Sequence, residues 1–172
     1  MRDLSKPTVP SDAIQHRFAE ETRARKAAAG PAASLADGEG SPAELREALA
    51  AAVEGLAGEI VALSHAVHDN PEVGYEERFA VSTVAELLRA HGIEPDVGVY
   101  GMETALRAEF TGAVGNADNA GSPAPAIAIL AEYDALPGIG HGCGHNVMAG
   151  NSVGAFLALY ELERRRPGSV PG

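Results

Sequence analysis

The side chains best suited to chemistry lie in one short stretch, residues 131–146. It holds two carboxylates, two imidazoles and the only thiol of the chain: Glu132, Asp134, His141, His145 and Cys143. A thiolate and a neutral imidazole are competent ligands for Zn²⁺ and similar divalent metals. Glycines flank Cys143 on both sides, so the backbone is free to turn its sulfur and the His145 ring towards one point. The spacing therefore predicts a metal site with Cys143 and His145 as ligands.

Less specific interpretations of these residues stay open. A lone cysteine is most often a small buried hydrophobe, although the glycines beside Cys143 make a packing role less expected. Asp134 is also compatible with a turn residue and Glu132 with a solvated strand end. His141 fits a supporting group, a substrate contact or a polar loop residue equally well. A cysteine nucleophile with a histidine base is a further alternative, but residues two apart in one loop rarely meet in that geometry.

Two helices are expected before this stretch. Leucine, isoleucine and valine recur at steps of three and four over residues 45–67, which indicates a long amphipathic helix. Residues 41–44, Ser-Pro-Ala-Glu, are typical of a capping box at its start, and Asn70-Pro71 ends it. A second helix is expected from about Glu76 to Ala90, followed by His91 in the last turn and Gly92 beyond it.

Strands and a third helix are expected next. Alternation over residues 96–99 and 106–110 predicts a hairpin. The run Pro125–Ala131 is continuously apolar, as expected of a central strand covered on both faces. Glu132 and Asp134 follow its carboxyl end, where ligands bind in open α/β sheets. A helix over residues 147–162 completes the order ααβββα, which predicts a mixed α/β fold.

Composition limits the class of partner. The 172 residues carry 13 Lys and Arg against 24 Asp and Glu, a formal net charge of −11, which argues against nucleic acid and anionic membranes. One cysteine makes no intramolecular disulfide, so a cytoplasmic location is the default expectation. No apolar run is expected to reach the roughly 18 residues of a membrane span. Residues 1–40 are interpreted as a flexible tail and linker with a helix over 11–29, and residues 41–172 as the folded part.

Two motifs carry a resemblance to a known family. The first is His68-Asp69-Asn70-Pro71-Glu72, followed by Gly74-Tyr75-Glu76-Glu77. The second is Glu132-Tyr133-Asp134-Ala135-Leu136-Pro137 with Gly140-His141-Gly142-Cys143-Gly144-His145-Asn146. Together they resemble the aminoacylase and carboxypeptidase family of dinuclear metallopeptidases, in the amidohydrolase branch that contains p-aminobenzoyl-glutamate hydrolases and Xaa-Lys/Arg-type dipeptidases.

The resemblance implies a function for the site residues. Cys143 and His145 would be metal ligands, and Asp134 would be a carboxylate that orients a ligand. Related branches have a ligand histidine at the position of Glu132, so Glu132 is not assigned to the metal. The complete enzyme would have an αβα-sandwich catalytic domain with two Zn or Mn ions, would form a homodimer, and would hydrolyse a small N-acyl amino acid or dipeptide.

The family's paired glutamates and two further histidine ligands have no counterpart here. The resemblance therefore implies that residues 41–172 are an N-terminal part of the catalytic domain, without the rest of that domain and without the lid and dimerisation domain. We expect such a chain to be inactive on its own. Two other classes stay open: a binding module without catalysis that retains half of the fold, and a thiol enzyme that depends on Cys143.

Overall fold

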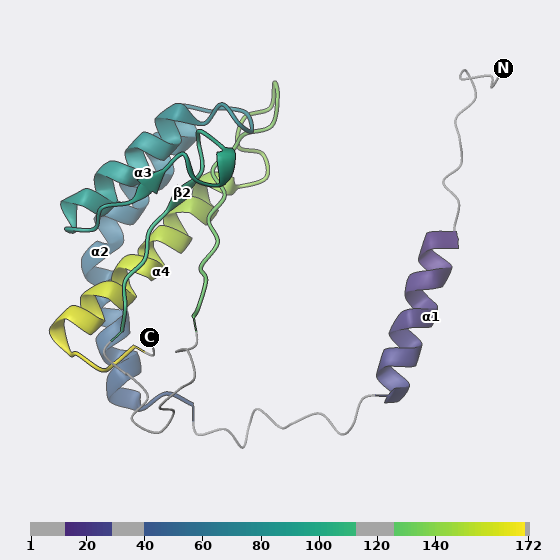
Figure 1. Ribbon diagram of the computed structural model, residues 1–172, viewed down its shortest axis with the longest axis horizontal. Helices are drawn as coiled ribbons and strands as arrows, with labels where there is room; N and C mark the ends of the chain where they lie inside the picture. The colour runs from purple at the N-terminus through teal and green to yellow at the C-terminus, as the bar shows by residue number, and fades with distance from the viewer. Residues whose placement is uncertain (1–12, 29–39, 113–125, 171–172) are drawn as a thin grey trace. The chain divides into compact units, whose positions relative to one another are not determined.

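The computed structural model describes residues 13–28, 40–112 and 126–170 (Figure 1). Contacts divide the chain into two units, residues 1–40 and 41–172, and each is described by itself. The first unit contains α1, Ala13–Ala28, which confirms the helix expected there. An Arg17–Glu21 ion pair of 2.8 Å, one helical turn apart, lies on its exposed surface.

Three helices build the second unit. They are α2 (Ala43–Asp69), α3 (Arg78–Ala90) and α4 (His145–Arg165). Their apolar faces meet in one core, in which Val67 of α2 and Leu157 of α4 are fully buried and Leu88 of α3 is 2% exposed. On α3 the small residues Ala80 and Ala85 are buried, while Phe79 is 40% exposed.

Close contact between α2 and α4 depends on two glycines. A Cβ added at Gly154 would lie 2.5 Å from Ile60 Cδ1, and one added at Gly150 would lie 3.1 Å from the Ile60 carbonyl oxygen. A side chain at Gly154 would therefore require the Ile60 side chain to move, and one at Gly150 would be in tighter than ordinary contact with the α2 backbone. The missing side chains therefore let α4 approach the backbone of α2, as small residues do at other helix interfaces.

The start of α2 differs from the prediction. Pro42 is extended, with ψ of 142°, and occupies the N-cap position without a side-chain hydrogen bond, so the capping box is wrong. The helix begins one residue later than expected, which moves Ser41 outside it. The Pro42 carbonyl accepts the first backbone bonds, from Leu45 and Arg46, and the Arg46 guanidinium donates to the Ser41 carbonyl. The predicted end at Asn70 is confirmed.

Helix α2 also corrects an expectation about membranes. By length and composition alone it is apolar enough to cross one, and it is the one such helix among the described residues. Core helices of soluble proteins satisfy the same criterion, so this is weak evidence. Leu56, Leu63 and Val67 of α2 lie in the shared helical core.

A small hairpin follows α3. Gly92, with φ of +80°, ends the helix as predicted, and β1 (Asp96–Val97) then pairs antiparallel with β2 (Leu106–Arg107). The expected hairpin is confirmed, but each strand is only two residues long, because a 3-10 turn over Val99–Gly101 interrupts the first one. The described part of the chain is therefore mixed, with helices and one small two-stranded sheet.

The predicted central strand is wrong for the described part of the run, residues 126–131. These residues are extended but belong to no strand, and Ile127 and Leu130 are 71% and 81% exposed. A strand covered on both faces needs neighbouring strands to satisfy its backbone, and the described residues place none beside it. One side-chain bond, from Ser152 Oγ to the Leu130 carbonyl at 2.6 Å, attaches this segment to α4.

Candidate metal centre

His145 lies between two carboxylates at the start of α4. It is the first residue of the helix, two positions before the start expected from the sequence, and it follows Gly144, whose φ is +79°. Its Nδ1 lies 2.8 Å from Asp134 Oδ1 and 3.1 Å from the Asp134 carbonyl oxygen. Its Nε2 lies 3.0 Å from Glu132 Oε2. The fold thus brings together three of the residues that the sequence singled out.

The two ring nitrogens of His145 have different surroundings. Nδ1 faces two oxygens of Asp134, so it carries a proton and donates it. A carboxylate in that position fixes the orientation of an imidazole and directs Nε2 outward, which is the usual arrangement behind a metal-ligating histidine. Nε2 in turn faces the Glu132 carboxylate, which is attractive only when a proton or another cation lies between them.

Cys143 is exposed, two residues before His145. No hydrogen bond to its Sγ is found within residues 40–112 and 126–170, so the structure gives it neither a base nor an orienting partner. Sulfur, imidazole nitrogen and carboxylate oxygen are all donors that Zn²⁺ accepts, and in this chemical sense Cys143, His145 and Glu132 fit a divalent metal. The described residues nevertheless contain no group of three or more such side chains already arranged around one point.

His141 is half-buried in the same loop. Both of its ring nitrogens are shielded from solvent and have no hydrogen-bond partner among the described residues. Its ring centroid lies 6.2 Å from that of His68, at an interplanar angle of 31°. The structure therefore places the His141 ring near His68 of the first motif.

The first motif supports the loop of residues 132–146. The Glu72 carbonyl accepts a 2.7 Å hydrogen bond from the Ala135 backbone N–H, and Val73 and Ala135 form a parallel bridge. These contacts hold the chain directly after Asp134. The Glu72 carboxylate also accepts hydrogen bonds from the N–H groups of Phe79 and Ala80, at 2.9 and 3.0 Å, at the start of α3. One glutamate thus joins the loop to a helix.

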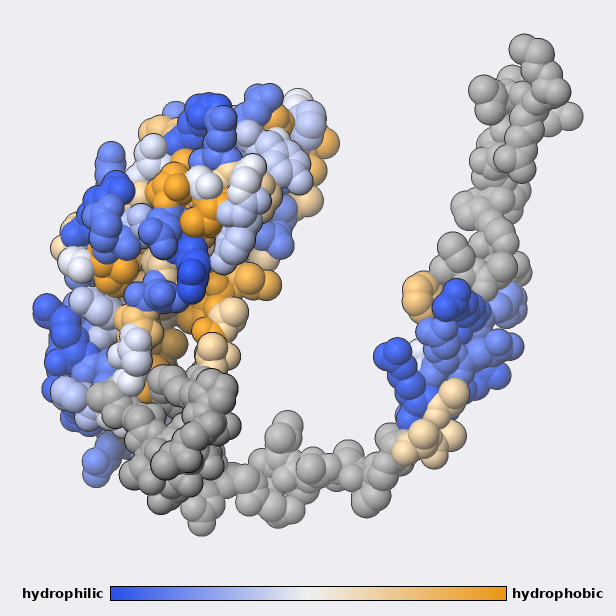
Figure 2. Space-filling view, viewed as in Figure 1, coloured by the Kyte–Doolittle hydropathy of each residue, from blue (hydrophilic) through white to orange (hydrophobic). Residues whose placement is uncertain are grey.

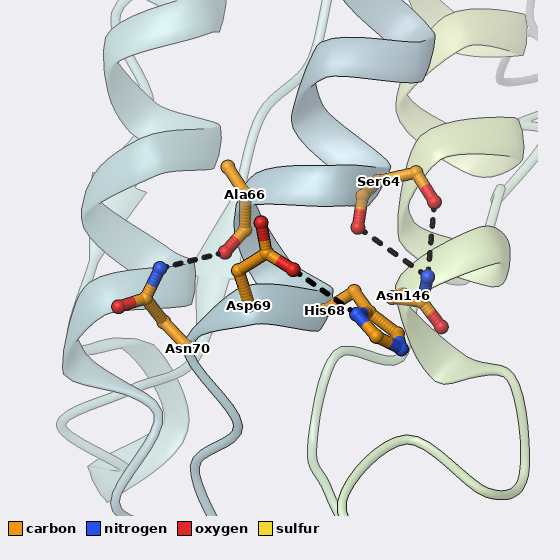
Figure 3. Close-up of polar contacts among 6 residues, drawn as sticks. All are labelled: Ser64, Ala66, His68, Asp69, Asn70 and Asn146. Atoms are coloured by element: carbon orange, nitrogen blue, oxygen red, sulfur yellow. Dashed lines mark hydrogen bonds and ion pairs between the residues drawn. The ribbon is translucent and has the colours of Figure 1, made fainter.

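Asn146 attaches the other side of the loop to α2. It is 7% exposed, and its Nδ2 donates to the Ser64 Oγ and carbonyl oxygen at 3.1 and 3.3 Å (Figure 3). On the same helix, His68 Nδ1 lies 3.2 Å from Asp69 Oδ1, and Asn70 donates to the Ala66 carbonyl (Figure 3). The loop is therefore held at both ends by the C-terminal turns of α2 and the residues that follow.

A buried polar network that the sequence patterns did not predict lies beside the loop. The Glu77 carboxylate, 8% exposed, accepts a 2.5 Å hydrogen bond from Thr104 Oγ1, and the Tyr133 hydroxyl donates to the Thr104 carbonyl. Burial, reinforced by the negative charge of Glu77, raises the pKa of Tyr133 to about 12. The two hydrogen bonds join residues that are 27 and 29 positions apart, so local sequence patterns do not reveal them.

Comparison with known proteins agrees with the family resemblance that the two motifs carry. The chain is 38% identical to mouse Xaa-Arg dipeptidase over 121 residues, which are 67% of the chain and 27% of that protein. It is 40% identical to human Xaa-Arg dipeptidase over 105 residues, 57% of the chain and 23% of that protein. It is 31% identical to thermostable carboxypeptidase 2 of Saccharolobus solfataricus over 114 residues, 58% of the chain and 27% of that protein.

No protein-family model matches the chain. It spans about a quarter of the length of these three relatives. The aligned stretch covers more than half of the chain in each case, and the relatives are named as dipeptidases and a carboxypeptidase. The homologues of this stretch are thus peptidases of the kind that its motifs predicted.

Proposed function

We propose that these residues are part of the catalytic domain of a metal-dependent amidohydrolase or dipeptidase, of the αβα-sandwich type, that cleaves a small N-acyl amino acid or dipeptide. The observation that carries the proposal is the alignment of Asp134, His145 and Glu132, in which Nδ1 is held and Nε2 is directed at a carboxylate. The printed names of the relatives support the same class of reaction.

The described residues would have the following roles. His145, through Nε2, and Cys143 would bind a divalent metal, Zn or Mn, and Glu132 is close enough to His145 to add an oxygen. Asp134 would hold the imidazole in the required tautomer by accepting the Nδ1 proton. A bound cation would supply polarisation of the amide carbonyl and activation of a water molecule. The first motif and Asn146 keep these side chains in place.

The donor set of the described residues is incomplete for this chemistry. A catalytic metal normally has three protein ligands and a position for water, and hydrolysis also needs a general base. We therefore expect the 172-residue chain alone to bind metal weakly and to show no turnover.

Cobalt titration of the purified chain tests the ligand assignment. Co²⁺ is a spectroscopic substitute for Zn²⁺, and we expect a thiolate-to-cobalt absorption band that disappears in Cys143→Ala and weakens in His145→Ala. His65→Ala is the matched control, because His65 is an exposed imidazole elsewhere on α2. A band that survives in both site variants contradicts the assignment, provided that circular dichroism shows both variants folded.

An activity assay tests the predicted lack of turnover and the thiol-enzyme alternative. The chain is incubated with Mn²⁺ or Zn²⁺ and with aminoacyl-arginine or aminobenzoyl-glutamate substrates. Turnover that is lost in Cys143→Ala overturns the prediction of an inactive chain but supports the metal site. Turnover that resists a chelator and is blocked by iodoacetamide favours the thiol enzyme instead.

A further inference from the structure

Three glutamates are buried in the described part of the second unit, although acidic side chains usually lie on the surface. Figure 2 shows hydrophilic residues over much of the visible face of that unit. The buried three are Glu77, Glu161 and Glu163. Glu161 forms ion pairs with two arginines of its own helix, and Glu163 accepts two backbone N–H bonds from the turn that follows. Both of these carboxylates are therefore well compensated.

Glu77 has fewer partners. Its carboxylate accepts one side-chain hydrogen bond, from Thr104 Oγ1 at 2.5 Å, and no ion pair joins it to another described residue. It directly precedes α3, so the helix dipole adds some attraction. Burial removes a carboxylate from water, and one hydrogen bond and a helix end compensate only partly. Stability alone is thus a poor explanation for a carboxylate at this position.

Thr104 connects Glu77 to the segment that carries the candidate metal site. It is 6% exposed, and both of its polar groups are used. Its hydroxyl donates to the Glu77 carboxylate, and its carbonyl accepts the hydrogen bond of the Tyr133 hydroxyl. Glu77 therefore restrains Thr104, and Thr104 restrains the phenol of Tyr133.

Tyr133 lies in the chain between the two carboxylates that contact His145. Asp134 Oδ1 is 2.8 Å from Nδ1 of that ring, and Glu132 Oε2 is 3.0 Å from Nε2. The two acidic side chains are 35% and 53% exposed, so their own surroundings restrain them little. Successive side chains of an extended segment alternate between two faces. Fixing the Tyr133 side chain at Thr104 therefore sets the direction of both neighbours.

We propose that Glu77 is a positioning residue of the candidate metal site, which acts through Thr104 and Tyr133 on the two carboxylates beside His145. The inference rests on the proposed function for its metal, but the restraint on the His145 ring is measurable without one. Loss of the Glu77 carboxylate should leave the helices folded and free the ring.

Nitrogen-15 NMR of the purified chain reads this restraint without metal. The Nδ1 proton of His145, which is donated to Asp134, should exchange slowly with water, and its signal is assigned by its absence in His145→Ala. We expect Glu77→Ala to speed this exchange about tenfold or more. Glu77→Gln keeps a carbonyl oxygen that can accept from Thr104, so this conservative variant should retain slow exchange.

Two further variants separate positioning from a general loss of stability. Thr104→Val removes the same hydrogen bond with little change of shape, so it should act like Glu77→Ala and decides the matter if the alanine variant does not fold. Ile93→Val is the matched control, because Ile93 is 6% exposed in the helical core beyond the opposite end of α3. It should leave the exchange unchanged. Circular dichroism shows which variants are folded.

Cobalt titration of the same proteins connects the restraint to the metal. The Co²⁺ affinity should fall about tenfold or more in Glu77→Ala and Thr104→Val, because the imidazole is no longer held. It should stay close to that of the unmodified chain in Glu77→Gln and Ile93→Val. If the unmodified chain gives no cobalt band, the proposed function fails, and the exchange of the His145 proton still decides whether Glu77 positions the ring.

The inference is overturned if the unmodified chain has no slowly exchanging His145 proton. It is also overturned if Glu77→Ala and Thr104→Val leave the exchange or a measurable cobalt affinity unchanged. Equal acceleration in Ile93→Val would show a general loss of stability instead. Equal acceleration in Glu77→Gln would show that the hydrogen bond to Thr104 does not transmit the effect.

Discussion

The contact between α4 and α2 at Gly154 yields a quantitative test of the fold. In Gly154→Ala the new Cβ would lie 2.5 Å from Ile60 Cδ1 and 2.8 Å from Ile60 Cγ1. Overpacking of this kind costs about 1–3 kcal/mol of unfolding free energy. Alanine gains about 1 kcal/mol over glycine in a helix interior. The net effect should therefore be a loss of about 0–2 kcal/mol.

Ile60→Ala separates the two contributions. It removes Cδ1, Cγ1 and Cγ2, the three atoms that a Cβ at Gly154 would meet. In this background only the helix propensity remains, so Gly154→Ala should stabilise the chain by about 1 kcal/mol. The coupling energy in the double-mutant cycle should then equal the overpacking cost, about 1–3 kcal/mol.

Urea unfolding followed by circular dichroism measures all four proteins of the cycle. Gly58→Ala on α2 is the matched control, because its added Cβ meets nothing within 4 Å, and it should stabilise the chain in either background. The reasoning fails if Gly154→Ala stabilises the chain equally with and without the Ile60 side chain, since the coupling energy would then be zero.

Three further predictions follow from the contacts around the loop. Glu72→Gln leaves one acceptor for the N–H groups of Phe79 and Ala80 and should cost about 1–2 kcal/mol in urea unfolding, whereas the exposed neighbour Glu76→Gln should cost little. The raised pKa of Tyr133, about 12 against an ordinary 10.0, gives stability that is complete below pH 10 and is lost as pH rises towards 12, because the unfolded phenol ionises first. Tyr133→Phe should flatten that alkaline loss in a pH series of unfolding midpoints, and an unchanged slope would contradict the burial argument. Asp134→Ala should weaken Co²⁺ binding about 10–100-fold by freeing the His145 ring, and an unchanged affinity would show that Asp134 does not orient it.

Local patterns predicted the helices well because helix formation depends on short-range periodicity. The apolar periodicity over residues 45–67 predicted α2, and Gly92 predicted the end of α3. The start of α2 was wrong because a capping box assumes a helical Pro42, and the extended conformation of that residue moved the start by one position. Helix boundaries depend on single backbone angles, which a pattern of residue types does not fix.

The run 125–131 shows a different limit. Its composition predicts a buried strand, but burial requires neighbours on both edges, and the described residues supply only β1 and β2. Ile127 and Leu130 therefore stay exposed. Whether a segment forms a strand depends on the segments that pair with it, and a local sequence pattern does not identify those segments.

The sequence by itself determined the donor types and the resemblance to peptidases and amidohydrolases. Four side chains could be recognised as possible metal donors or supporting groups from their types and their position within one short loop: Cys143, His145, Asp134 and Glu132. Only the tertiary structure decided which groups meet. In the structure, His145 lies between Asp134 and Glu132, the His141 ring lies near that of His68, and Cys143 is exposed. It also gave the first motif its role, since the Glu72 carbonyl accepts a backbone hydrogen bond from Ala135, 63 positions further along the chain, and any residue type would make that bond. Backbone contacts between distant segments depend on the packing of whole helices, so residue type and spacing leave them undetermined.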